Sequence, residues 1–228
     1  MTDRCTFGSE IYFNELILRE CQEKTLGVLS QVERWTKPLF DIKRADFYFT
    51  FDDNIASVQG EKMTAVSYES GVVIVRVFDQ NYKEEELASL LFHELNHIAR
   101  GKLFSVEEKP KLFNWMLLEG LAVVFERWAM QKFYQQDAVG MHENTCSESE
   151  LKDGLRQILE IDESDLGWNY YDWFYNFDRQ AHLPVNFAYQ IGEWLVKRYC
   201  KENRVLPHQA LVVSNEDFLR FGENLCAK

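Results

Sequence analysis

The amino-acid sequence predicts an α+β fold in which a long helix and a small, largely antiparallel sheet are followed by a helical lobe. Three observations support this fold class. Apolar residues recur at helical spacing near the N-terminus, aromatic and β-branched residues concentrate in residues 45–80, and helix-forming sequence fills most of the chain after that point. With 228 residues, of which 46% are hydrophobic, the chain can bury the core of one domain spanning residues 1–228.

The first predicted element is a helix over residues 9–35, whose apolar side chains share one face and whose N-terminal cap is Ser9. Three predicted strands follow, at residues 45–51, 64–70 and 71–80. They are rich in the aromatic and β-branched residues that strands favour, and the third, GVVIVRVFDQ, is the most strongly β-branched. Together these segments predict a small sheet that is largely antiparallel.

The helical part of the chain begins after Asn81. The segment KEEELASLLFHELNHIARG starts with acidic residues and ends at Gly101, where a C-terminal cap belongs, so we predict a helix over residues 83–100. Further helices are predicted at residues 110–135, 148–160 and 184–202, the last of these beginning at Pro184, and after Asn215. The sequence shows no internal repeat and no flexible linker.

Composition excludes several classes of partner. The net charge of −12 and the isoelectric point near 4.9 argue against a surface that neutralises phosphates, so we expect no nucleic-acid partner. No secretory signal is visible and no segment is apolar over the roughly 20 residues that span a bilayer, so we expect a cytoplasmic protein without a membrane partner. The cysteines are scattered without a close pair, which predicts reduced thiols: Cys5, Cys21, Cys146, Cys200 and Cys226.

The stretch LLFHELNHIARG, residues 90–101, contains the first candidates for chemistry. His93 and His97 are four residues apart on the predicted helix, so both imidazoles can reach one point on the same face. Glu94 projects beside that point without having to bind the ion, where a general base can take a proton from a metal-activated water. This is the HExxH arrangement of zinc peptidases. The alternative is an ordinary amphipathic helix with two polar histidines.

A third ligand is predicted in FNWMLLEGLAVVF, residues 113–125, where Glu119 interrupts an apolar helical run. Burying a carboxylate is unfavourable unless the group is paired or binds a metal. Glu119 follows His97 by 22 residues, which allows the first helix to end and a second to run back beside it. Two histidines and one glutamate with an open fourth position form a catalytic type of zinc site. The alternative is a glutamate exposed at the edge of its helix.

The segments LLFHELNHIAR, LLEGLAVVFE and AYQIGEWLVKRY together resemble the DUF2268 family of predicted Zn-dependent proteases, within the broader gluzincin metallopeptidases. The resemblance covers roughly residues 45–202. It implies a zincin-like fold and the hydrolysis of peptide bonds in a peptide or protein substrate. It also implies Zn²⁺ held by His93, His97 and Glu119, with Glu94 as the general base. The substrate sequence and the oligomeric state stay open.

One position departs from a related pattern. Thermolysin-like zinc peptidases have an Asp four residues after the glutamate ligand, which supports a zinc histidine, and this chain has Val123 there. The support must therefore come from another residue. Glu126, seven residues after Glu119 and so on the same helical face, is one candidate. The alternative for Glu126 is a solvent-facing acid beside Arg127.

Peptide hydrolysis also needs a donor for the developing oxyanion. Tyr189 is the first choice, because the resemblance places its helix near the site. His182 and the aromatic segment WNYYDWFYNF, residues 168–177, are rivals. The alternative for Tyr189 is packing in the core as an aromatic residue at helical spacing.

The substrate could be held by a strand, since an exposed sheet edge pairs with an extended peptide through backbone hydrogen bonds. Residues 71–78 are the candidate edge, an idea that fails if this strand is central. A rival enzyme class, deformylation, would use a cysteine as the third ligand, and no cysteine lies near this helix in the sequence. The rival outside catalysis is a metal-stabilised binding or chaperone-like module without turnover.

Overall fold

The structure is a computed structural model that describes residues 9–52, 62–104, 111–138, 145–161, 166–175 and 183–227. The chain divides into two compact units. The first contains Met1–Lys102 and Phe125–Gly140, and the second contains Leu103–Val124 and Met141–Lys228. The prediction of a single domain over residues 1–228 stays a prediction. None of the helices in these ranges combines the length and the apolar character needed to cross a bilayer.

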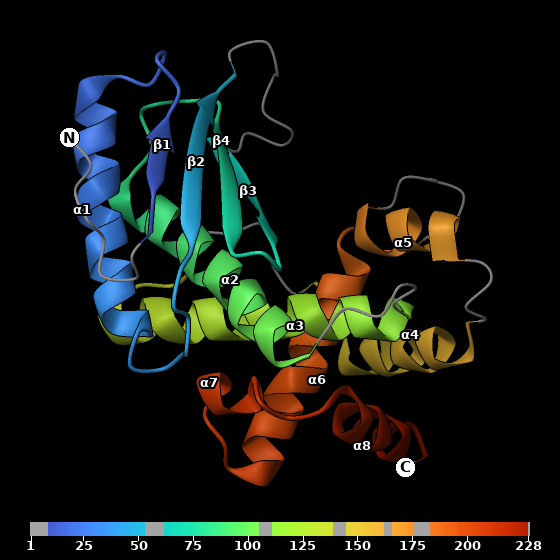
Figure 1. The fold of residues 1–228 in the computed structure, drawn as a ribbon. Helices are drawn as coiled ribbons and strands as arrows, with labels where there is room; N and C mark the ends of the chain where they lie inside the picture. The colour runs from blue at the N-terminus through green and yellow to red at the C-terminus, as the bar shows by residue number, and fades with distance from the viewer. Residues whose placement is uncertain are drawn as a thin grey trace. The chain divides into compact units, whose positions relative to one another are not determined.

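The first unit contains a four-stranded sheet, drawn in blue to green in Figure 1. Its strands, in the order β1-β2-β4-β3, are β1 (Ile11–Phe13), β2 (Asp46–Phe51), β4 (Val72–Val77) and β3 (Met63–Tyr68). β1 and β4 both run parallel to β2, and only β3 is antiparallel to its neighbour. The α+β class is therefore confirmed, whereas the expectation of a largely antiparallel sheet was wrong, because the sheet is mixed.

The parallel pairing of β1 and β2 follows from an element that the sequence prediction missed. Residues 11–13, which we assigned to the first helix, form β1, and the helix α1 is confined to Arg19–Thr36. Because a helix connects β1 to β2, the chain returns to the same end of the sheet and the second strand enters parallel to the first. Ser9 caps no helix: its hydroxyl donates a hydrogen bond to Glu33 Oε1 at 3.3 Å.

The strongly β-branched strand β4 lies inside the sheet, between β2 and β3. Its residues pair with Asp46–Phe51 on one side and with Met63–Tyr68 on the other. Paired on both sides, residues 71–78 cannot accept an extended peptide, so that prediction was wrong. A run of β-branched residues is typical of an interior strand, since both neighbours and at least one face cover it.

Two helices carry the residues that the sequence predicts as metal ligands. The helix α2 (Glu84–Leu103) passes diagonally across the sheet in Figure 1. The helix α3 (Leu112–Ala129) ends in a π-helical turn, η2 (Met130–Tyr134), so the predicted helix over residues 110–135 is close to the observed one. Within the first unit the ring of Trp35 on α1 stacks at 4.9 Å on Phe133 and at 6.4 Å on Phe92. These contacts tie α1, α2 and the end of α3 together.

The second unit is helical and is organised around α6 (Phe187–Asn203), which contacts the other C-terminal helices. These are α4 (Glu148–Glu160), α5 (Leu166–Tyr175), α7 (Pro207–Ala210) and α8 (Asn215–Ala227). The residues Leu112–Val124 of α3 contribute to the same apolar core. Ser147 and Glu150 form a capping box that starts α4 where the sequence predicted it. α6 begins at Phe187 rather than at Pro184, after Asn186 in a left-handed conformation.

Candidate metal centre

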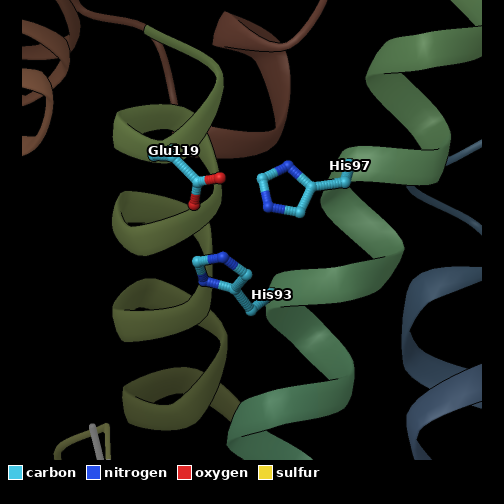
Figure 2. A group of neighbouring side chains, drawn as sticks. All are labelled: His93, His97 and Glu119. Atoms are coloured by element: carbon cyan, nitrogen blue, oxygen red, sulfur yellow. The ribbon is translucent and has the colours of Figure 1, made fainter. Parts of the chain in front are cut away.

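The two histidines of the HELNH segment point to the same place. His93 and His97 lie one turn apart on α2, and their ring centroids are 4.7 Å apart. Figure 2 shows both rings reaching from α2 toward the carboxylate of Glu119 on α3. One nitrogen from each histidine and one oxygen from Glu119 all lie within 4.8 Å of one another. The structure thus brings together the three residues that the sequence singled out as a ligand set.

The donor set fits a zinc ion by geometry and by chemistry. Three atoms no more than 4.8 Å apart enclose a point that is within about 2.8 Å of each. Zinc binds histidine nitrogen and carboxylate oxygen at about 2.0–2.2 Å, so small side-chain movements bring all three into range. No cysteine belongs to the group, and two imidazoles with one carboxylate are a set that zinc accepts.

A second glutamate of α3 holds one of the histidines. His93 Nδ1 lies 3.2 Å from Glu126 Oε2, and the hydroxyl of Ser89 donates a hydrogen bond to Glu126 Oε1 at 2.5 Å. Glu126 is only 7% exposed, so it is not the solvent-facing acid that was the alternative. Its carboxylate instead bridges Ser89 and His93. Glu126 therefore contacts a histidine of the group, as its candidate role of supporting a zinc ligand requires.

Ser89 is a residue that the sequence reasoning missed. It lies four residues before His93 and is fully buried on α2. The only signal in the sequence was this spacing, which places a hydroxyl on the same helical face as the histidine. Many buried serines show such spacing, and the partner Glu126 lies 37 residues away in the chain.

Glu94 is buried beside the histidines but is not part of the ligand group. Its side chain is 5% exposed, and its Oε2 atom has no hydrogen-bond partner in the part of the chain that the structure describes. A buried carboxylate oxygen without a partner is unfavourable. Such an atom fits a role in which the partner is a water or a substrate group.

Hydrogen bonds to Glu86 fix the N-terminal end of α2. The backbone amide of Lys83 donates to Glu86 Oε2 at 2.6 Å, and Lys62 Nζ contacts the same atom at 3.3 Å. Three acidic residues occupy the first turn and two basic residues the last, which favours the helix dipole. In the last turn, burial lowers the pKa of Arg100 to about 10, so its guanidinium stays charged at neutral pH.

The structure does not test the predicted oxyanion donors. Tyr189 is half-buried on α6, where it packs edge-on against Phe174 at 5.1 Å and borders the core of the second unit. That environment agrees with the packing role that was its alternative, and its role as a donor stays a prediction. His182 lies outside the described residues. So does part of the aromatic segment at residues 168–177, whose Tyr171 and Tyr175 are exposed.

Four cysteines lie in the described ranges, and none of them forms a disulfide there, in line with the predicted reduced thiols: Cys21, Cys146, Cys200 and Cys226. Burial raises the pKa of the Cys200 thiol to about 11, which makes it a poor nucleophile and a poor metal ligand at neutral pH. Cys5 lies outside the described residues.

Comparison with known proteins points to one family. The model of the family described as "Predicted Zn-dependent protease (DUF2268)" matches residues 20–220 of the 228 in the chain. The match includes α2 and α3 with all three members of the ligand group, and it extends beyond the segment over which the sequence motifs showed the resemblance. No curated protein matches the chain.

Proposed function

The chain belongs to the DUF2268 family of predicted Zn-dependent proteases, and on this premise we propose that it is a zinc metallopeptidase of the gluzincin type. The observation that carries the proposal is the convergence of His93, His97 and Glu119 in one group. Glu94, the residue after His93, adds a buried Oε2 atom that has no hydrogen-bond partner among the described residues. A general base in the residue that follows His93 would give this oxygen a partner, the attacking water.

Each residue has a role in the proposed reaction. When bound, zinc acidifies the attacking water and polarises the scissile carbonyl. Glu94 takes the proton of that water and passes it to the leaving amine nitrogen, which is the work of a general base that becomes a general acid. Because Glu94 is buried, bulk water does not compete for its carboxylate. Its Oε2 atom has no hydrogen-bond partner among the described residues and can accept a hydrogen bond from the attacking water.

The contact with Glu126 determines which nitrogen of His93 faces the ion. If Nδ1–H donates to Glu126, the lone pair of Nε2 is free for the metal. The Ser89 hydroxyl keeps the carboxylate in place. Glu126 and Ser89 therefore orient one ligand, His93, before the metal binds.

The first test of the proposal is metal content together with turnover. Protein purified without chelator is expected to contain about one zinc per chain and to hydrolyse peptides, with activity lost on chelation and restored by zinc. Elemental analysis and a peptide-hydrolysis assay measure both. A protein that takes up no divalent metal after zinc supplementation, with His93 and His97 intact, would contradict the assignment.

With β4 interior, the sheet has two edge strands, β1 and β3, and β3 is the one that we propose for an extended substrate. No strand among the described residues pairs with its outer side, and its sequence, MTAVSY, has none of the charges or prolines that usually protect an edge. The turn after β3 lies near the metal ligands: a Cβ built on Gly101, one turn after His97, would lie 3.3 Å from Glu69 Cγ. We therefore place the substrate backbone along Met63–Tyr68.

Hydrogen exchange tests this placement. An extended tripeptide hydroxamate, which combines a zinc chelator with a peptide backbone, is expected to protect amides of β3 from exchange. Acetohydroxamate chelates zinc without a peptide backbone and is the control. Protection that appears instead on β1, the other edge of the sheet, or that is equal for the two compounds, would show that the substrate is held elsewhere.

A further inference from the structure

Two glycines meet where α3 and α6 cross within the second unit. Gly120 directly follows Glu119 on α3, and Gly192 lies near the middle of α6. Both are fully inside helices, where glycine lowers helix stability relative to alanine. A pair of such residues facing each other calls for a physical reason.

The reason is the closeness of the two backbones. A Cβ built on Gly192 would lie 2.2 Å from the carbonyl oxygen of Met116, and 3.0 Å from Gly120 Cα. A Cβ built on Gly120 would lie 2.3 Å from the carbonyl carbon of Gly192. All of these neighbours are backbone atoms, which cannot turn away as a side chain can. Any side chain at either position would force the helices apart.

The part of α3 that α6 touches is the turn that carries Glu119. Met116 and Gly120 are the two ends of one helical turn, and Glu119 lies within it. We propose that Gly192 is a positioning residue for Glu119: by letting the α6 backbone rest directly on this turn, it sets where the carboxylate stands. This inference rests on the proposed function, because it takes Glu119 to be a zinc ligand.

The geometry of a metal site makes such positioning matter. Ligand distances in a zinc site hold to within about 0.2 Å. Relieving a 2.2 Å contact to ordinary van der Waals distance requires the two helices to separate by more than about 1 Å. A displacement of that size on the α3 turn moves Glu119 relative to His93 and His97, which are carried by α2.

Two other glycines of the same unit provide matched controls. A Cβ on Gly154 of α4 would lie 2.6 Å from Ile191 Cδ1 and from Phe187 Cζ, the tips of side chains on α6. Gly154→Ala therefore crowds the same helix without touching the α3 turn. A Cβ on Gly222 of α8 would meet Leu155 Cδ2 at 3.4 Å, an ordinary contact. Gly222→Ala measures the effect of alanine in a helix without crowding.

The experiment compares zinc affinity across these variants, measured by competition with a chromophoric chelator well below each variant's melting temperature. Gly192→Ala is expected to bind zinc about ten- to a hundredfold more weakly than the unaltered protein. This is the usual loss of affinity when a residue that orients a metal ligand is replaced. Its Co²⁺-substituted form should have the absorption spectrum of Co²⁺-substituted Glu119→Ala. Gly154→Ala is expected to lose thermal stability but keep its zinc affinity, and Gly222→Ala should keep both. Zinc affinity in Gly192→Ala equal to that of the unaltered protein, or equal losses in Gly154→Ala, would overturn the proposal.

Hydrogen exchange on the unaltered protein gives an answer even if Gly192→Ala does not fold. Because coupling is reciprocal, a crossing that positions a zinc ligand must itself be stabilised by zinc. Adding zinc is expected to slow exchange on α6 around Gly192 and leave α8 unchanged. Slowing on α2 and α3 alone would overturn the proposal. Failure of the proposed function looks different: the unaltered protein would then bind no zinc, and Glu119→Ala would have no effect on metal.

Discussion

Glu94→Gln is expected to keep about one zinc per chain while peptide hydrolysis falls by about 10²- to 10⁴-fold, the usual contribution of a general base. The change leaves the ligand group of His93, His97 and Glu119 intact. It replaces a carboxylate that can accept a proton by an amide that cannot. Because the amide is nearly the same size, the buried position beside the histidines is refilled without a cavity.

The matched control is Glu84→Gln, which makes the same chemical change at an exposed position in the first turn of the same helix. It should leave zinc content and turnover unchanged. Metal content and hydrolysis are measured on both variants. Loss of zinc in Glu94→Gln would mean that Glu94 is a ligand, and full activity would mean that another group accepts the proton.

Glu119→Ala is expected to lose zinc affinity and, with it, the stability that zinc confers on the folded chain. Binding to the folded state alone stabilises a protein by about 2.7 kcal/mol at a ligand concentration a hundred times the dissociation constant. If affinity falls by a hundredfold at that concentration, most of this stabilisation disappears. For a chain of this size the melting temperature then falls by roughly 5 to 10 °C.

A chelator separates the metal contribution from the packing contribution. Thermal unfolding is followed with excess zinc and with EDTA. The stability difference between Glu119→Ala and the unaltered protein should be large in zinc and shrink in EDTA, because a buried carboxylate without its cation no longer stabilises the chain. A difference that is the same in both conditions would make Glu119 a structural residue. Zinc content equal to that of the unaltered protein would remove it from the ligand set.

Much of the candidate site could be predicted from the sequence, because its main features are local. The spacing of His93 and His97 places both rings on one face of any helix, and the acidic start of α2 helps to make that segment a helix. Glu119 stood out because a carboxylate in an apolar helix needs a partner. The same reasoning placed α2, α3 and α4 close to their observed bounds, and the family assignment followed from the same segments.

Other features were decided by contacts between distant parts of the chain. A strand of three residues, β1, shows no recognisable period, so the sequence could not reveal that the sheet begins with a parallel pair. The interior place of β4 depends on which strands pair with it. A β-branched sequence alone does not determine that pairing.

The contacts that position the candidate ligands also join distant parts of the chain. Glu126 and Ser89 are ordinary residues in their own helices. They acquire a role because the Glu126 carboxylate on α3 contacts both Ser89 and His93 on α2. Gly120 and Gly192 look in the sequence like weak points of two helices. The backbone contact between them appears only once the helices are packed. The helical period and the chemistry of single residues act over a few positions, so the sequence alone determined the candidate ligand set and the main helices. The strand order, the contacts that hold His93 and the close approach of α3 and α6 arise from the packing of segments far apart in the chain, which only the folded structure determines.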